Sequence, residues 1–271
     1  MPVEQEIRFA VVIYGGVSLA VYINGVAQEI LRLVRSTAAC HKETALRGSE
    51  KVYRKLGALI GAGGLVAGAR AMAAEKTVDF DDVRSRFVVD ILSGTSAGGI
   101  NAIFLSKALA NDQSLDQLAQ MWIEEADIDV LLNDKQSLEG PLDLQDPPES
   151  LLNSERMYLK LLDALDGMDA GTNGQPRPPL VNTIDLFSTA TDLYGVALPI
   201  ALTDKLVYER RFRNVFHFER RPVSEKTVTG KDKPHYNDFL FANNPFLAFA
   251  ARCTWPSRSP SSPWRCAMSP M

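Results

Sequence analysis

The segment Gly94-Thr95-Ser96-Ala97-Gly98 limits the fold most, because an apolar run precedes it and helical spacing follows it. Residues 87–92 are typical of a short buried strand, and residues 99–109 place apolar side chains along one face of a helix. A strand, a tight turn and a helix would hold Ser96 at the turn, which is the arrangement of a nucleophile elbow. The alternative is a plain strand-to-helix turn in which Ser96 only caps the helix.

The two glycines of this segment fit the steric needs of an elbow. The strand and helix backbones approach closely there, so the positions two residues from the serine must lack side chains. The helix N-terminus favours negative charge, and the N–H of Ala97 can face a developing oxyanion. We therefore take Ser96 as the candidate catalytic nucleophile, with Gly94 and Gly98 as its elbow glycines.

A second unit of strand, glycine turn and helix opens the chain. Residues 9–14 form an apolar, β-branched run, for which we expect a strand buried on both faces of a largely parallel sheet. Gly15-Gly16 ends this run, and residues 17–34 show helical spacing. Residues 42–86 are interpreted as an insertion of helices. This order predicts an α/β fold whose two glycine turns share the carboxyl edge of the sheet.

The remaining sequence predicts helices, strands and loops on which the site depends less. The acidic residues 127–129 are interpreted as a solvated helix end, and the Arg-rich residues 209–213 and 220–221 as the solvated side of strands rather than a lipid or nucleic-acid patch. The expected elements are helices 114–126, 153–165 and 246–252, strands 182–191 and 206–218, and loops 133–150 and 166–179.

Composition excludes several classes of protein. The 271 residues carry a net charge of −4, which argues against a nucleic-acid partner. Cys40, Cys253 and Cys266 are odd in number and lack C-x-x-C spacing, so neither a disulfide framework nor a metal site is predicted. The N-terminus has acidic residues where a signal peptide would be basic, and residues 57–69 are too short to span a bilayer. We expect a cytoplasmic protein without a transmembrane segment, and its peripheral attachment to membranes and its oligomeric state stay open.

Gly15 and Gly16 are candidates for the second half of an oxyanion site. An acyl-transfer serine needs hydrogen-bond donors for the oxyanion, and bare backbone N–H groups after a strand can supply them. The alternatives are a structural strand-to-helix turn and a phosphate site of a nucleotide. The segment following Gly15 fits neither G-x-G-x-x-G nor a P-loop, which weakens the nucleotide interpretation.

Three segments, residues 12–26, 91–102 and 186–195, make the chain resemble the patatin-like phospholipase family, in particular its bacterial patatin-related group. The resemblance covers roughly residues 7–254. It implies a three-layer α/β/α fold and hydrolysis of lipid acyl esters by a Ser–Asp dyad, without histidine or cofactor. Carried over, Ser96 is the nucleophile, and Gly15, Gly16 and the N–H of Ala97 form the oxyanion site. Val17-Ser18 replaces the family's third glycine and basic residue, which removes a basic side chain near a phospholipid phosphate.

The aspartate that the resemblance implies is missing from the sequence. The family carries it in a D-G-G or D-G-A motif downstream, and the only Asp-Gly here is Asp166-Gly167, in a segment typical of a turn. Residues 255–271 contain four prolines and five serines and are interpreted as a disordered tail. We interpret the tail as a frameshift or premature end that replaces the aspartate's segment; a genuine Pro/Ser tail is the alternative.

Without the aspartate, two other interpretations have to be weighed. His217 and His235 follow Ser96, as the histidine of a Ser–acid–His triad would, although His217 lies in a strand-like run and His235 in a polar loop. A serine with no base is a poor nucleophile, so we expect impaired turnover of lipid esters. The second interpretation is a non-catalytic lipid- or acyl-binding module.

Overall fold

The computed structural model describes residues 5–16, 19–61, 85–125, 128–135, 138, 152–170, 177–222 and 236–255. Several sequence-based predictions therefore lie outside the described residues: the glycine-rich part of the 42–86 insertion, most of the 133–150 loop, His235 and the tail from residue 256 onward.

A five-stranded mixed sheet, with strand order β1-β2-β3-β4-β5, organises the molecule. The first three strands are parallel to one another, and β4 and β5 are antiparallel to their neighbours. The predicted α/β class is thus confirmed, with its parallel part confined to β1, β2 and β3. The strands are β1 (Gln5–Ile13), β2 (Ser85–Thr95), β3 (Ile184–Ala201), β4 (Leu206–Arg221) and β5 (Tyr236–Asn237).

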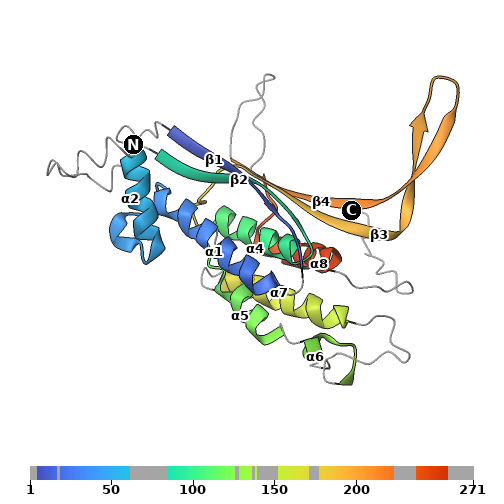
Figure 1. Ribbon diagram of the computed structural model, residues 1–271, viewed down its shortest axis with the longest axis horizontal. Coiled ribbons are helices and arrows are strands. Elements are labelled where there is room, and N and C mark those ends of the chain that lie inside the picture. Colours follow the sequence, from blue (N-terminus) through green and yellow to red (C-terminus); the bar gives the residue numbers. More distant parts are fainter. Residues whose placement is uncertain are drawn as a thin grey trace.

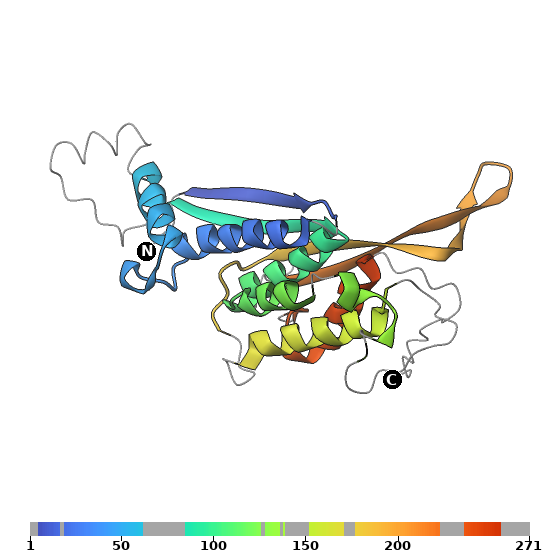
Figure 2. The ribbon, with the colours of Figure 1, turned by 60° about the horizontal axis from the view of Figure 1, so that its bottom comes forward.

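The helices gather on one side of this sheet, where α1 lies under β1 and β2 (Figure 2). Helix α4 is the centre of the core, because each of its residues is buried. Apolar residues lie on every side of this helix, and its few polar side chains, such as Asn101 and Lys107, find hydrogen-bond partners inside the core, so no face needs solvent. The α-helices are α1 (Ala20–Thr37), α2 (Ser49–Gly61), α4 (Ala97–Asn111), α5 (Asp116–Glu125), α6 (Ile128–Leu131), α7 (Ser154–Ala170) and α8 (Asn244–Thr254).

A buried ion pair fastens α4 to its neighbours. Lys107 Nζ lies 2.9 Å from Asp169 Oδ2 of α7 and donates to the carbonyl of Phe239 at 3.0 Å. Burial lowers the pKa of Lys107 even though Asp169 favours its charged form. Asn111 also donates to the Phe239 carbonyl, so α4 is joined to both α7 and the segment that leads into α8.

Strand β1 differs from the sequence-based expectation. Val11 and Ile13 pack on the core, but Phe9 and Val12 are exposed, Val12 to 60%. The prediction of a strand buried on both faces is wrong, because β1 lies at the edge of the sheet and no helix of the described residues covers its outer face (Figure 1). An apolar run predicts a strand but not what covers it.

Helix α7 corrects a second expectation. Asp166 and Gly167 lie inside this helix rather than in the predicted loop. Leu161, Leu165 and Met168 are buried along one face, and this helical spacing outweighs the turn tendency of an Asp-Gly pair. Of the acidic stretch 127–129, Ile128 and Asp129 belong to the short helix α6, and Asp127 lies outside the described residues.

Other expectations are confirmed or extended. Asn153 caps α7 through a hydrogen bond from the N–H of Arg156, at 3.0 Å, and α8 begins at Asn244, just before Pro245. Trp255, which we assigned to the tail, is buried and stacks on Trp122 with ring centroids 5.9 Å apart. The folded part of the chain therefore includes Trp255.

Strands β3 and β4 form a long hairpin that projects from the body (Figure 1). It bends where Gly195 has φ of 66° and where the Asp192 carboxylate accepts hydrogen bonds from two backbone N–H groups. Beyond this bend both faces are exposed, and cross-strand pairs such as Ile200 with Val207 are apolar. Its exposed large apolar side chains are Leu193, Tyr194, Val196, Leu198, Ile200, Leu202, Leu206, Tyr208, Phe212 and Val215.

Candidate active site

Ser96 lies between the end of β2 and the start of α4, so the predicted strand, turn and helix are confirmed. Its backbone has φ of 54° and ψ of −134°, which side-chain-bearing residues rarely adopt. Such a conformation costs about 1–3 kcal/mol and persists only where its surroundings enforce it. Ser96 makes no side-chain cap to α4, so the helix-capping alternative does not describe it.

The elbow glycines are where the chain segments touch. A methyl group on Gly94 would lie 2.5 Å from the carbonyl oxygen of Gly98, and one on Gly98 would overlap the carbonyl of Ile13. The backbones of β1, β2 and α4 thus meet without side chains between them. This close approach accounts for both glycines of the motif.

The turn after β1 lies directly against Ser96. A methyl group on Gly15 would overlap Ser96 Cβ and lie 3.0 Å from Ser96 Oγ. The neighbouring Gly16 has φ of 155°, and its carbonyl accepts a hydrogen bond from the N–H of Leu19 at the start of α1. The N–H of Ala97 belongs to the first turn of α4, whose N–H groups have no acceptor within the helix. The structure therefore brings Gly15 to the nucleophile, with Gly16 next to Gly15 and Ala97 next to Ser96 along the chain.

Two hydroxyls that the sequence did not reveal also meet at the elbow. Thr254, the last residue of α8, accepts a hydrogen bond from the N–H of Ser96 at 2.7 Å. Added atoms on Gly99 would contact Thr254 and the Ser188 hydroxyl of β3, and this buried hydroxyl has no hydrogen-bond partner among the described residues. No local signal marks these residues, since 158 positions separate Ser96 from Thr254.

Buried amide side chains connect the helices that follow the two glycine turns. Gln28 donates to Asn24, and Asn24 donates to Asn101, at 2.9 and 3.2 Å. Asn101 donates in turn to the carbonyl of Ala97 at 2.9 Å. This chain of hydrogen bonds fixes α1 against the first turn of α4. The signal in the sequence was two asparagines at otherwise apolar helix positions.

No carboxylate or imidazole of the described residues is hydrogen-bonded to Ser96 Oγ. Asp166, the sequence's only aspartate before a glycine, accepts a hydrogen bond from Asn244 at 2.8 Å. His217 pairs with Asp185 at 2.8 Å and stacks on Phe187. Asp166 and His217 are thus hydrogen-bonded to other residues, and no hydrogen bond joins either side chain to Ser96.

Asp185 anchors a polar group on the exposed side of β3 and β4. Burial opposes its ionisation, but hydrogen bonds from Arg221 and His217 outweigh this effect and hold the pKa of Asp185 below its ordinary value. Asp185 is therefore a charged partner for His217 at neutral pH. Asp185 and His217 are paired like the acid and the histidine of a catalytic triad, but no serine of the described residues is hydrogen-bonded to His217.

Comparisons with known proteins give one relative and no fold assignment. No family model matches the chain, and no solved structure matches it. Over 191 residues it is 30% identical to the Uncharacterized membrane protein Rv3479 of Mycobacterium tuberculosis (strain ATCC 25618 / H37Rv). The match covers 70% of this chain and 15% of that protein. Among the described helices, none has the length and apolar character needed to cross a membrane.

Proposed function

We propose that this chain carries the nucleophile and oxyanion half of a serine acyl hydrolase of the patatin-like phospholipase family, acting on lipid esters. The contact of Gly15 with Ser96 carries the proposal. A strained serine at the head of a buried helix, with a second glycine turn against its side chain, is the geometry that acyl transfer requires.

In this mechanism Ser96 Oγ attacks the ester carbonyl carbon, and the carbonyl oxygen becomes an oxyanion. The N–H groups of Gly15, Gly16 and Ala97 would stabilise it, and the N-terminus of α4 would favour its charge. Collapse of the intermediate expels the alcohol, which takes up the proton removed from Ser96, and leaves an acyl-enzyme. Water then hydrolyses the acyl-enzyme to a fatty acid and free Ser96.

The base that removes the serine proton has no candidate among the described residues. Without it Ser96 keeps the reactivity of an ordinary hydroxyl, and we expect slow or absent turnover. This same observation favours the second candidate function, a non-catalytic lipid- or acyl-binding module.

A lipid surface as the place of action is supported by exposed apolar side chains. Tyr14, just before the Gly15-Gly16 turn, and Tyr22 of α1 are more than 70% exposed, and the β3–β4 hairpin carries a longer series of exposed apolar side chains. Exposed apolar side chains of this kind suit a membrane interface. The relative's name, a membrane protein, agrees with this location.

The family's three-layer fold is part of the same proposal. The described helices pack on one side of the sheet, and the exposed side chains Phe9 and Val12 of β1 and Ile91 of β2 mark where a second helical layer would pack.

A fluorophosphonate probe tests the reactivity of Ser96. Since no described residue activates Ser96, we expect only slow covalent labelling of the chain and none of Ser96→Ala, with circular dichroism as the control for folding. Labelling that persists in Ser96→Ala would exclude Ser96 as the reactive group. A folded chain that is not labelled but retains a fluorescent fatty acid would favour the binding module, and hydrolysis of a nitrophenyl ester would favour the enzyme.

A further inference from the structure

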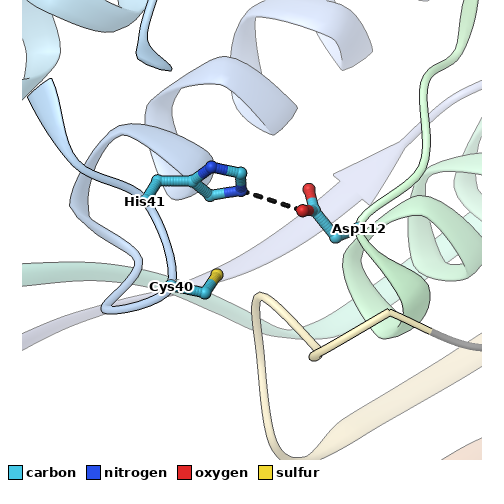
Figure 3. A group of neighbouring side chains, drawn as sticks. All are labelled: Cys40, His41 and Asp112. Carbon is cyan, nitrogen blue, oxygen red and sulfur yellow. Dashed lines mark hydrogen bonds and ion pairs between the residues drawn. The ribbon is translucent and has the colours of Figure 1, made fainter. Parts of the chain in front are cut away.

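Cys40, His41 and Asp112 come together on the side of the core away from the elbow turn (Figure 3). Cys40 and His41 follow α1, and Asp112 ends α4. One sulfur, one imidazole nitrogen and one carboxylate oxygen all lie within 4.8 Å of one another. No local spacing pointed to this cluster, because 71 positions separate His41 from Asp112.

The carboxylate of this cluster is held in place from two directions. Arg35 Nε donates to Asp112 Oδ1 at 3.0 Å, which leaves Oδ2 facing His41 Nε2 at 2.9 Å. The backbone of Asp112 is left-handed, with φ of 49°, and is fixed by the hydrogen bond that ends α4. A hydrogen bond that orients a ligating carboxylate from behind is a usual feature of metal sites.

A second cluster on the sheet shows what a site without room for a cation looks like. Asp185, His217 and Glu219 also bring three ligand atoms within 4.8 Å of one another. There Arg221 lies 2.6 Å from Asp185 and 2.9 Å from Glu219, so its guanidinium already takes the position of the cation. Arg35 instead approaches Asp112 on the oxygen remote from His41.

We propose that Cys40, His41 and Asp112 form a zinc site. A thiolate, an imidazole and a carboxylate suit Zn²⁺, and three protein ligands leave the fourth tetrahedral position to water. The Cys40 thiolate and the Asp112 carboxylate would face the ion with two negative charges, and Glu50, 3.6 Å from Arg35, offsets part of the charge of that guanidinium.

Zinc at this position would connect the segment after α1 to the end of α4. These helices follow the two glycine turns, so the ion would fasten their far ends as the Asn24–Asn101 contact fastens their near ends. The inference stands independently of the proposed hydrolase, because it needs no residue of the elbow.

Cobalt(II) substitution tests the site in the whole chain. The wild type should bind one Co²⁺ with thiolate-to-metal charge-transfer absorption, and excess Zn²⁺ should remove that absorption. Cys40→Ser should lose the absorption, and Asp112→Asn should weaken Zn²⁺ binding by about tenfold or more. Cys253→Ser, which removes the half-buried cysteine of α8, is the matched control and should behave as the wild type.

Thermal unfolding gives a second measurement. Zn²⁺ should raise the Tm of the wild type and of Cys253→Ser but not that of Cys40→Ser, because only a folded site adds binding free energy. The proposal is overturned if the wild type shows no charge-transfer absorption, if Cys40→Ser retains it, or if Cys253→Ser loses it. Since Cys40 is exposed, its substitution should leave the apo fold intact.

Discussion

The elbow and the β3–β4 hairpin belong to one sheet, yet they are held together in opposite ways. At the elbow, backbones from β1, β2 and α4 touch without side chains between them, and Ser96 is kept in a strained conformation. Beyond its bend the hairpin pairs strand with strand, and both of its faces are exposed to the extent that the described residues show. Packing density, not the type of element, separates the two regions.

This difference teaches where each kind of function can lie. A reactive group needs surroundings that enforce an unfavourable geometry, and only the packed end of the sheet supplies them. A surface that adapts to a membrane needs exposed apolar groups and little internal restraint, which the hairpin offers. Substitutions at the packed elbow should therefore change the free energy of unfolding more than substitutions toward the exposed end of the hairpin.

Gly98→Ala should destabilise the protein by about 2–3 kcal/mol, because the new methyl group overlaps the Ile13 carbonyl. Gly25→Ala in α1 is the matched control, since no atom lies within 4 Å of its added methyl group. There the higher helix propensity of alanine should stabilise by about 0.5–1 kcal/mol. Urea denaturation of both variants measures the contrast, and equal effects would show that the elbow is not tightly packed.

Ser96→Gly should stabilise the protein by about 1 kcal/mol, because glycine adopts the φ of 54° without strain. Ser96→Ala keeps the Cβ and therefore the strain, so its stability should stay near that of the wild type. Thermal unfolding of the two variants side by side isolates the backbone effect from the loss of the hydroxyl. A glycine variant less stable than the alanine variant would contradict the strain.

Asp185→Asn should cost less than about 1 kcal/mol at neutral pH, because the ion pairs of Asp185 are largely exposed. Its folded pKa is below the ordinary value, so its contribution is present above about pH 4 and is lost as the pH falls through the folded pKa. The stability gap between wild type and variant should therefore close in acid. In the hairpin turn, Asp204→Asn removes a carboxylate without an ion pair among the described residues, and it should leave the free energy of unfolding at neutral pH unchanged.

Leu202→Ser with Leu206→Ser, at the hairpin end, should change the free energy of unfolding by less than about 0.5 kcal/mol. Binding to phosphatidylglycerol vesicles should nevertheless fall by about tenfold or more, because two apolar side chains no longer enter the lipid. Val52→Ser removes a still more exposed apolar side chain from α2 and should leave vesicle binding unchanged. Co-sedimentation with vesicles measures the binding of both variants. Equal losses of binding would show that the hairpin is not the membrane-contacting surface.

The parts of the site that the sequence predicted are those with a local signal. The elbow is five consecutive residues between an apolar strand and a helix, and all of that information is in one segment. Thr254 and Ser188 reach the elbow from elements distant in the sequence, so no spacing of residues along the chain could predict them. The exposure of Val12 depends on what covers the sheet, and the helical state of Asp166 depends on the buried face of α7.

The hydrogen bond from the N–H of Ser96 to Thr254 makes the geometry of the site depend on long-range contacts of the folded chain. The elbow collects groups from the first strand, the second strand and the last helix, so it is complete only after contacts as distant as 158 positions have closed. Such contacts form late, because closing a long loop costs conformational entropy before the contact contributes any favourable free energy. A partly folded chain in which α8 has not docked therefore lacks the complete geometry around Ser96.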